Sequence, residues 1–365
     1  MARGAWLEGF ACMAGITSNL PSSLHKKQVF AGNCAIAIAL GLSRFDFGIV
    51  ARLMQHDDWI SITGIGELAG LNVAGYVIGC IHHSRERSHK NLCKLLFLAL
   101  LLIFSLWLEL VNWPFPVRLL IRFINGWSAA HLVCGIPALA LRGISKHQAR
   151  RYTAFLVSGA GIGSLIGAIS IGWIADNSPT FAWIVISACA TLLAIPVAWL
   201  LVESSRVRGE RKSTTLQPGA AEQRVRVKYQ NFKLAGLASG YSLIGAGMVP
   251  VILYGPLIAT QRLDASPIMS SDSFGLFGIG SVVGCFVASA FPSQWSNRTM
   301  LPLVSLFGLL GSVMFLIASD LYIEMTAIFL IGAWAYMTVA LTCDRLGELL
   351  NDTQKKRWWS LISSF

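Results

Sequence analysis

The sequence predicts an all-α, polytopic membrane protein: a bundle of six helices followed by four. Hydrophobic residues make up 55% of its 365 residues and charged residues 13%, about half the charged share of an average soluble protein. The mean hydropathy is +0.61. Several runs of about 20 residues carry almost no charge, and that length crosses a bilayer. This composition excludes a soluble enzyme, a nucleic-acid-binding domain and a disordered scaffold.

Ten apolar runs are long enough to span a membrane. We expect each to be a helix, because lipid offers no hydrogen-bond partner to an open backbone. Turn-forming residues at 112–116, 176–179 and 266–267 separate some of them. The predicted spans are 28–53, 59–82, 93–112, 116–141, 152–176, 181–202, 232–260, 273–291, 300–320 and 322–343.

Basic residues predict the orientation. With the N-terminus in the cytoplasm, all but five of the 29 Lys and Arg lie on the cytoplasmic side. The exceptions are Arg52, Arg118 and Arg262 outside and Arg44 and Arg122 within spans. The positive-inside rule therefore predicts a multi-pass protein of the inner (plasma) membrane with a cytoplasmic N-terminus. The net charge of +11 is explained by topology, so we expect the lipid bilayer and no nucleic acid as a partner.

The spans divide the chain into five parts. The longest loop is basic and lacks apolar periodicity, which predicts a flexible linker between the two groups of helices. The expected parts are a cytoplasmic N-terminal segment 1–27, a first six-helix half 28–202, a basic cytoplasmic linker 203–231, a second half with four helices 232–343, and a cytoplasmic tail 344–365.

Cysteine and histidine residues suggest neither disulfides nor a metal site. The eight cysteines fall mostly within spans or at their cytoplasmic ends, where we expect free thiols. One predicted loop gathers Cys80, His82, His83, His89 and Cys93, which are residue types that bind zinc. Their spacing matches no closed four-ligand pattern, so we interpret the cluster as a basic, histidine-rich loop and expect no metal and no cofactor.

The sequence contains an internal repeat. The segments 70–80 and 275–285, in the second and eighth predicted helices, share six of eleven residues. The second and eighth helices are six apart, an even number, so both segments cross the membrane in the same direction. The repeat is therefore parallel, as in transporters built from two similar halves. A chance match between glycine-rich apolar helices is the alternative. Glycine is absent from 93–112 and 181–202, which predicts that every third helix is peripheral and faces lipid.

Four ionisable residues lie well inside predicted spans: Arg44, Asp46, Glu67 and Arg122. A lone charge at mid-bilayer costs at least about 2.5–3.5 kcal/mol, so each should face a cavity or pair with another charge. All four are expected roughly 9 to 13 Å below the outer ends of their helices, where they are able to neutralise one another. We therefore name them as candidate substrate or proton-coupling residues. A static ion-pair network that only holds the helices together is the alternative.

Two further titratable residues have simpler interpretations. His131, further along the fourth helix, is expected to pack through a hydrogen bond rather than to relay protons. Glu109 is expected to be a solvated residue at the outer surface. The chain has no Gly-x-Ser-x-Gly elbow, Walker loop or His-Glu-x-x-His motif, so we do not expect an enzyme, and any transport would be secondary.

Several motifs resemble a known family. Segment 41–45, Met54-Gln55 and the pattern Gly-x-Asn-x-x-Gly-Tyr-x-x-Gly at 70–79 resemble the YbfB/YjiJ-type branch of the major facilitator superfamily. Segment 122–126 resembles that superfamily's Arg-x-x-x-Gly signature, which is associated with proton coupling. Segment 159–167 resembles its glycine-rich antiporter-type motif without the usual proline. The resemblance implies two halves that rock around a central cavity.

The chain also departs from that family. His83 stands where the superfamily signature has an aspartate, Ile49 and Arg52 stand where the branch has prolines, and Asp46 is not expected at its position. Only four predicted helices follow the linker, so the last two helices of the family pattern are apparently lacking. The chain is then truncated, assembles with a partner, or is no longer an active carrier.

We therefore expect a secondary active transporter of a small organic solute, coupled to protons and working by alternating access. Arg44 and Arg122 would attract negative charge, and Glu67 would carry the proton. The alternative is a truncated, non-transporting membrane protein with a structural ion-pair network. The protein is expected to be a monomer, with a partner if the chain is complete at ten helices.

Overall fold

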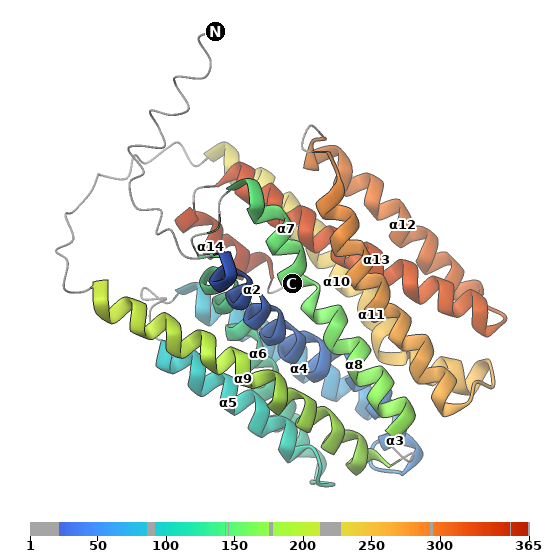
Figure 1. The fold of residues 1–365 in the computed structure, drawn as a ribbon. Helices are drawn as coiled ribbons and strands as arrows, with labels where there is room; N and C mark the ends of the chain where they lie inside the picture. The colour runs from blue at the N-terminus through green and yellow to red at the C-terminus, as the bar shows by residue number, and fades with distance from the viewer. Residues whose placement is uncertain are drawn as a thin grey trace.

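The computed structural model describes residues 22–85, 92–142, 144, 146–174, 178–211, 228–292, 295–350 and 352–363. Residues 1–21 of the expected N-terminal segment, 212–227 of the expected linker and 86–91 of the histidine-rich loop, with His89, lie outside them. The described chain is a bundle of helices that run side by side (Figure 1). The helices are α2 (Ser22–Ile36), η1 (Ala37–Phe45), α3 (Phe47–His56), α4 (Ile62–Arg85), α5 (Leu92–Leu108), α6 (Phe115–Ala140), α7 (Lys146–Val157), α8 (Gly159–Ile174), α9 (Pro179–Arg211), α10 (Lys228–Arg262), α11 (Pro267–Ala290), α12 (Asn297–Ile317), α13 (Leu321–Leu349) and α14 (Asp352–Ile362).

The predicted all-α membrane bundle is confirmed. Within the described ranges, nine helical stretches are long and apolar enough to cross a membrane. The first joins α2, η1 and α3 as Leu24–His56, and the fourth joins α7 to α8 as Arg150–Gly172. The tenth expected span is α5, which has 17 residues and is therefore about 26 Å long. A turn at 109–111 and Pro114 follow α5 before α6 begins.

The internal repeat corresponds to equivalent packing in the two halves. On α4, a Cβ atom at Gly75 would lie 2.2 Å from the carbonyl oxygen of Phe123 on α6. The matching residue on α11 is Gly280, where a Cβ would lie 2.2 Å from the carbonyl oxygen of Phe329 on α13. In both halves, glycine lets the second helix touch the backbone of the fourth. This shared geometry favours a true repeat over a chance match.

The contact between α4 and α6 yields a prediction for stability. A Cβ atom at Gly126 would lie 1.9 Å from the carbonyl oxygen of Asn72, whereas nothing lies within 4 Å of a Cβ at Gly70. We expect Gly126→Ala to lower the free energy of unfolding by about 1–3 kcal/mol through overpacking. Gly70→Ala, on the same pair of helices, is the matched control and should change it little. Thermal unfolding of the purified protein measures both, and equal effects would contradict the packing described here.

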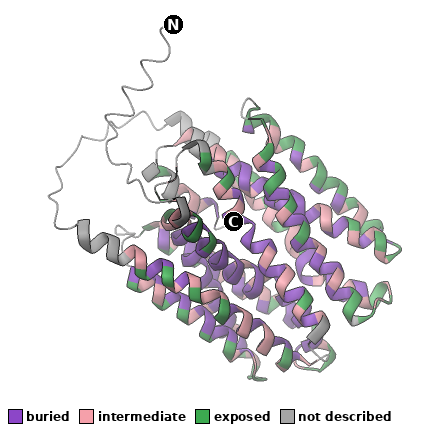
Figure 2. Ribbon diagram, viewed as in Figure 1, coloured by how far each residue is buried: buried purple, intermediate pink, exposed green. Residues whose placement is uncertain are grey.

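The expected peripheral helices are at the surface. Large apolar side chains on α5, α9 and α12 are exposed, among them Phe97 (61%), Ile195 (67%) and Leu316 (71%). Figure 2 shows exposed residues gathered along α12 at one edge of the bundle and buried residues toward its centre. Exposed leucine and phenylalanine on a membrane helix face lipid chains, so every third helix forms the outer wall of its half.

The expected linker and the expected tail both contain helix. The expected linker 203–231 is helical at both ends, because α9 continues to Arg211 and α10 begins at Lys228. Glu and Arg are good helix formers, so polar turns extend the apolar spans. The tail contains α14, whose Trp358, Trp359 and Ile362 pack in a small apolar cluster with Leu234 and Leu346. α14 contacts α4 and α6 of the first half and α10 and α13 of the second.

Candidate functional site

The candidate site begins with an irregular turn in the first span. The segment η1 is π-helical, and the N–H of Asp46 donates to the carbonyl of Gly41, five residues back, over 3.1 Å. Single π-helical stretches inside α-helices occur often at functional sites. Arg44 lies within η1, and Asp46 comes directly after it. The two side chains face different neighbours, as expected for residues two positions apart on a helix.

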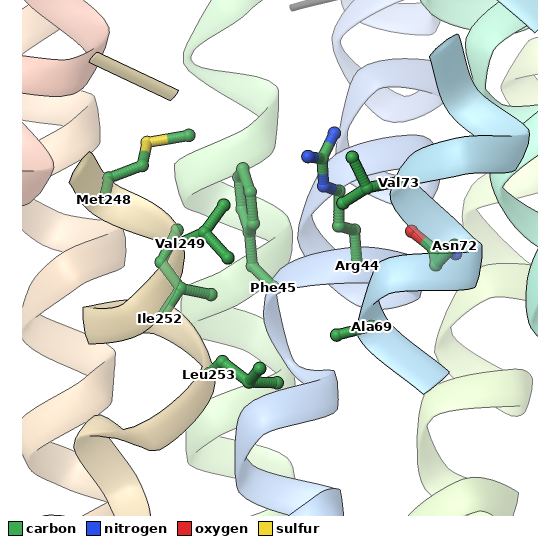
Figure 3. Close-up of a pocket in the computed structure, with 9 residues that line it drawn as sticks. All are labelled: Arg44, Phe45, Ala69, Asn72, Val73, Met248, Val249, Ile252 and Leu253. Carbon is green, nitrogen blue, oxygen red and sulfur yellow. The ribbon is translucent and has the colours of Figure 1, made fainter. Parts of the chain in front are cut away.

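Arg44 lines a pocket between the two halves of the bundle. In Figure 3, η1 carries Arg44 and Phe45 between α4 of the first half and α10 of the second. In this state the pocket encloses about 30 Å³, which is room for about one water molecule. Its lining residues are Arg44, Phe45, Ala69, Asn72, Val73, Met248, Val249, Ile252 and Leu253.

The guanidinium of Arg44 is positioned by an aromatic ring. Its Cζ lies 5.0 Å from the centroid of the Tyr76 ring on α4, a cation–π contact. Within the part of the chain that the structure describes, no carboxylate pairs with Arg44. The side chain is half-buried, and the pocket wall around it is otherwise nearly all apolar. Arg44 is therefore a cation available to a ligand.

Asn72 also lines the pocket, but its amide is used within the protein. Its Nδ2 donates to the carbonyl of Arg122 over 3.2 Å and to Oδ1 of Asn125 over 3.0 Å. The side chain is 2% exposed. Asn72 therefore ties α4 to α6 rather than offering donors to the pocket.

Asp46 is fully buried on the other side of η1. Its Oδ1 accepts a hydrogen bond from the Ser164 hydroxyl of α8 over 3.3 Å. Its Oδ2 has no hydrogen-bond partner among the described residues. A Cβ atom at Gly167 would lie 1.7 Å from Oδ2, so glycine is required there for the carboxyl group to fit.

Arg122 is enclosed at the end of the bundle where α3 lies. Its Nη1 donates to the carbonyl of Ser43 over 3.3 Å, and its Cζ lies 3.8 Å from the centroid of the Phe47 ring. Its Nε lies 3.9 Å from Oε1 of Glu109. Arg122 does not line the pocket, but Ser43 precedes Arg44, so its hydrogen bond reaches the backbone that carries Arg44.

The expectation of a solvated Glu109 was wrong. Glu109 is 1% exposed, and its carboxyl group faces the interior beside Arg122. The burial follows from its position in the turn after α5, beside the start of α6. This residue was missed although a signal existed: Arg118 and Arg122 are four apart on one helix face, and Glu109 is the nearest acidic residue in sequence.

The four intramembrane charges do not form one group among the described residues. Arg44 faces the pocket, Asp46 faces α8 and Arg122 faces Glu109. Glu67 is exposed on α4, and no ion pair joins it to either arginine within the described chain. The expected neutralisation of four charges at one level is therefore wrong, because each side chain meets a different helix.

His131 packs as expected. Its Nδ1 lies 3.0 Å from the carbonyl of Trp127, and its ring packs edge-on against His82 and His83. These three histidines belong to α4 and α6, and none of them lines the pocket.

Contacts between the halves close the bundle at one end through Arg150 of α7. Its Nε lies 2.9 Å from Oδ2 of Asp344 on α13. Its two terminal nitrogens donate to the carbonyls of Phe291, over 3.0 Å, and Ala288, over 2.9 Å. One guanidinium of the first half thus holds two segments of the second half, at the end where α9 stops and α10 starts. We call this the linker end.

Glycines bring the halves together along the rest of the seam. At the far end, a Cβ atom at Gly48 of α3 would lie 2.2 Å from the carbonyl oxygen of Ile252 on α10. Between the ends, a Cβ at Gly161 of α8 would lie 2.6 Å from the carbonyl oxygen of Gly278 on α11. The halves are therefore in direct contact toward both ends of the bundle, at Gly48 and at Arg150, and the Arg44 pocket lies between these two contacts.

Two groups of membrane helices that meet around a pocket with an available cation are typical of a polytopic membrane transport protein. The sequence matches, over residues 36–365, the family described as "Uncharacterised MFS-type transporter YbfB". The chain belongs to this family of the major facilitator superfamily, so it is a transporter and not an enzyme.

The fold is similar to that of a solved transporter. A crystal structure of a D-xylose-proton symporter superimposes with a TM-score of 0.60 and 15% sequence identity. The match covers 92% of this chain and 87% of that chain. At this identity, the similarity supports the fold alone. No curated protein sequence matches this chain.

Proposed function

We propose that the protein is a secondary active transporter that moves a small organic solute together with protons by alternating access. The observation that carries this proposal is the pocket of Arg44 between two separate closures. The contact of Gly48 with Ile252 lies at one end and that of Arg150 with Asp344 at the other. If the halves rock about the seam between α8 and α11, one closure opens while the other stays shut.

Each candidate residue has a distinct role in this proposal. Arg44 attracts the solute within the pocket. Arg122 and Glu109 form the coupling pair, because protonation of Glu109 would free Arg122 and change its hold on the backbone before Arg44. Asp46 is a second protonatable carboxyl group, on the same span as Arg44. Glu67, exposed on α4 two residues before Ala69 of the pocket, is the candidate entry point for the proton.

The orientation and location of the protein are part of the proposal. The distribution of Lys and Arg supports a cytoplasmic N-terminus in the inner (plasma) membrane. The linker end, with Arg150, then faces the cytoplasm, and Gly48 lies toward the outside. In an alternating-access carrier each end opens in turn, the linker end toward the cytoplasm and the opposite end toward the outside.

Transport is tested in liposomes that contain the purified protein and an internal pH-sensitive dye. Small carboxylates, sugars and amino acids are added one class at a time. We expect at least one class to change the internal pH only when the protein is present. If no solute changes the internal pH or accumulates beyond empty liposomes, the protein is not a proton-coupled carrier of these solutes. The non-transporting alternative would then account for its buried charges.

A further inference from the structure

We infer that the solute is an amphipathic carboxylate: a small molecule with one anionic head and an apolar aliphatic or aromatic body. This inference rests on the proposed transport function and names its substrate class. It depends on the chemistry of the nine residues that line the pocket and on which of their polar groups are already engaged.

Of the two polar residues that line the pocket, Arg44 is the one available to a ligand. Arg44 contacts the Tyr76 ring and has no carboxylate partner within the described chain. The Asn72 side-chain amide is engaged with α6 through two hydrogen bonds. A guanidinium recognises a carboxylate through two parallel hydrogen bonds, and it gains most when no protein carboxylate competes. The pocket therefore takes one negative charge.

The remaining wall is apolar and comes from both halves. On α10, Met248, Val249, Ile252 and Leu253 face η1, and Figure 3 shows their side chains directed toward Phe45 and Arg44. Phe45 is fixed by edge-to-face contacts with Phe277, at 5.5 Å between ring centroids, and with Tyr336, at 6.3 Å.

An apolar ligand body would contact α10 while its head binds η1, so binding would draw the halves together.

A sugar does not fit this wall. Each hydroxyl group that leaves water without gaining a hydrogen-bond partner weakens binding. The pocket offers the Arg44 guanidinium and one engaged amide to the several hydroxyls of a sugar. The solved protein of similar fold is titled a D-xylose-proton symporter, but the residues around Arg44 favour a different class of ligand.

The test measures binding to the purified full chain by thermal unfolding. The probes are phenylacetate and hexanoate, each with its uncharged amide, phenylacetamide and hexanamide, and D-xylose. We expect both carboxylates to raise the unfolding temperature, and the amides and D-xylose to have no effect. The amides have nearly the same shape, so the difference isolates the charge that Arg44 recognises.

Variants separate the head from the body of the ligand. Arg44→Gln should weaken carboxylate binding by about 10- to 100-fold, because it removes a hydrogen-bonded charge. Arg44→Lys should restore part of the loss. Val249→Phe keeps Arg44 but fills the pocket, so it should exclude phenylacetate. This variant tests the inference if Arg44→Gln does not fold. Arg262→Gln, at an exposed arginine at the end of α10, is the matched control and should bind like the natural protein.

The outcomes distinguish this inference from the transport proposal. Equal binding of amides and carboxylates, unchanged binding by Arg44→Gln, or no binding of any carboxylate would overturn the inference. Proton-coupled movement of D-xylose alone would also overturn it, while the transport proposal would stand. Carboxylate binding that depends on Arg44 without movement of any solute would overturn the transport proposal and leave the inference intact.

Discussion

Replacement of Arg122 by glutamine is expected to abolish proton-coupled uptake, a loss of at least about 100-fold, while the protein still inserts into the membrane. The guanidinium is 1% exposed, and its charge faces Glu109 at 3.9 Å. Removing one partner of a buried pair leaves the other charge uncompensated, which costs about 3–5 kcal/mol. The single variant should therefore lose both stability and uptake, as measured by thermal unfolding and by solute accumulation in liposomes.

The double variant Arg122→Gln/Glu109→Gln separates the two effects. It removes both charges, so we expect most of the lost stability to return. Uptake should stay absent if the pair couples the proton to the solute. If the double variant takes up solute at the rate of the natural protein, the pair is only structural. Arg262→Gln again serves as the control for a changed arginine outside the bundle interior.

Reversal of the charge at Arg150 is expected to open the linker end. In Arg150→Asp, two carboxylates meet at Asp344, and the carbonyls of Ala288 and Phe291 lose their donor. Both side chains of the natural pair are about one-quarter exposed, so solvent screens their attraction. We therefore expect the equilibrium between the two states to shift by about 1–2 kcal/mol, roughly 5- to 30-fold, toward the state open at this end. A carrier held in one state cycles more slowly, so uptake should fall.

Matched variants test the specificity of this closure. The exchange Arg150→Asp/Asp344→Arg re-forms an ion pair and should restore most of the uptake that Arg150→Asp loses. Arg151→Asp changes the adjacent exposed arginine on the same helix and should leave uptake nearly unchanged. An equal loss in both single variants would show that the net charge of this end, rather than the Arg150 contact, controls transport.

Much of the fold could be predicted from the sequence, because each span must by itself have the length and low charge that a bilayer requires. Length and charge alone locate the spans, and the distribution of glycine identifies the outer helices α5 and α9. The repeat at 70–80 and 275–285 anticipates the equivalent packing of Gly75 and Gly280. These features depend on short segments, so no knowledge of tertiary contacts is needed.

The site was less predictable because it depends on contacts between distant segments. Glu109 lies at the end of an apolar run and resembles a surface residue until α6 is packed beside it. The π-helical turn of η1 has no signature in sequence, yet it determines where Arg44 and Asp46 point. The amphipathic character of α14 is hidden by its charged residues, although Trp358 and Ile362 are four positions apart on one face.

The central claim, that two closures on either side of the Arg44 pocket open alternately, is tested most directly by distances between spin labels across both ends. One pair replaces the exposed residues Arg151 and Arg298 near the linker end, and the other replaces Ile62 and Arg262 at the far end. We expect phenylacetate and a change of pH to lengthen one distance while shortening the other. Distances that stay fixed, or that lengthen together, would contradict alternating access around this pocket.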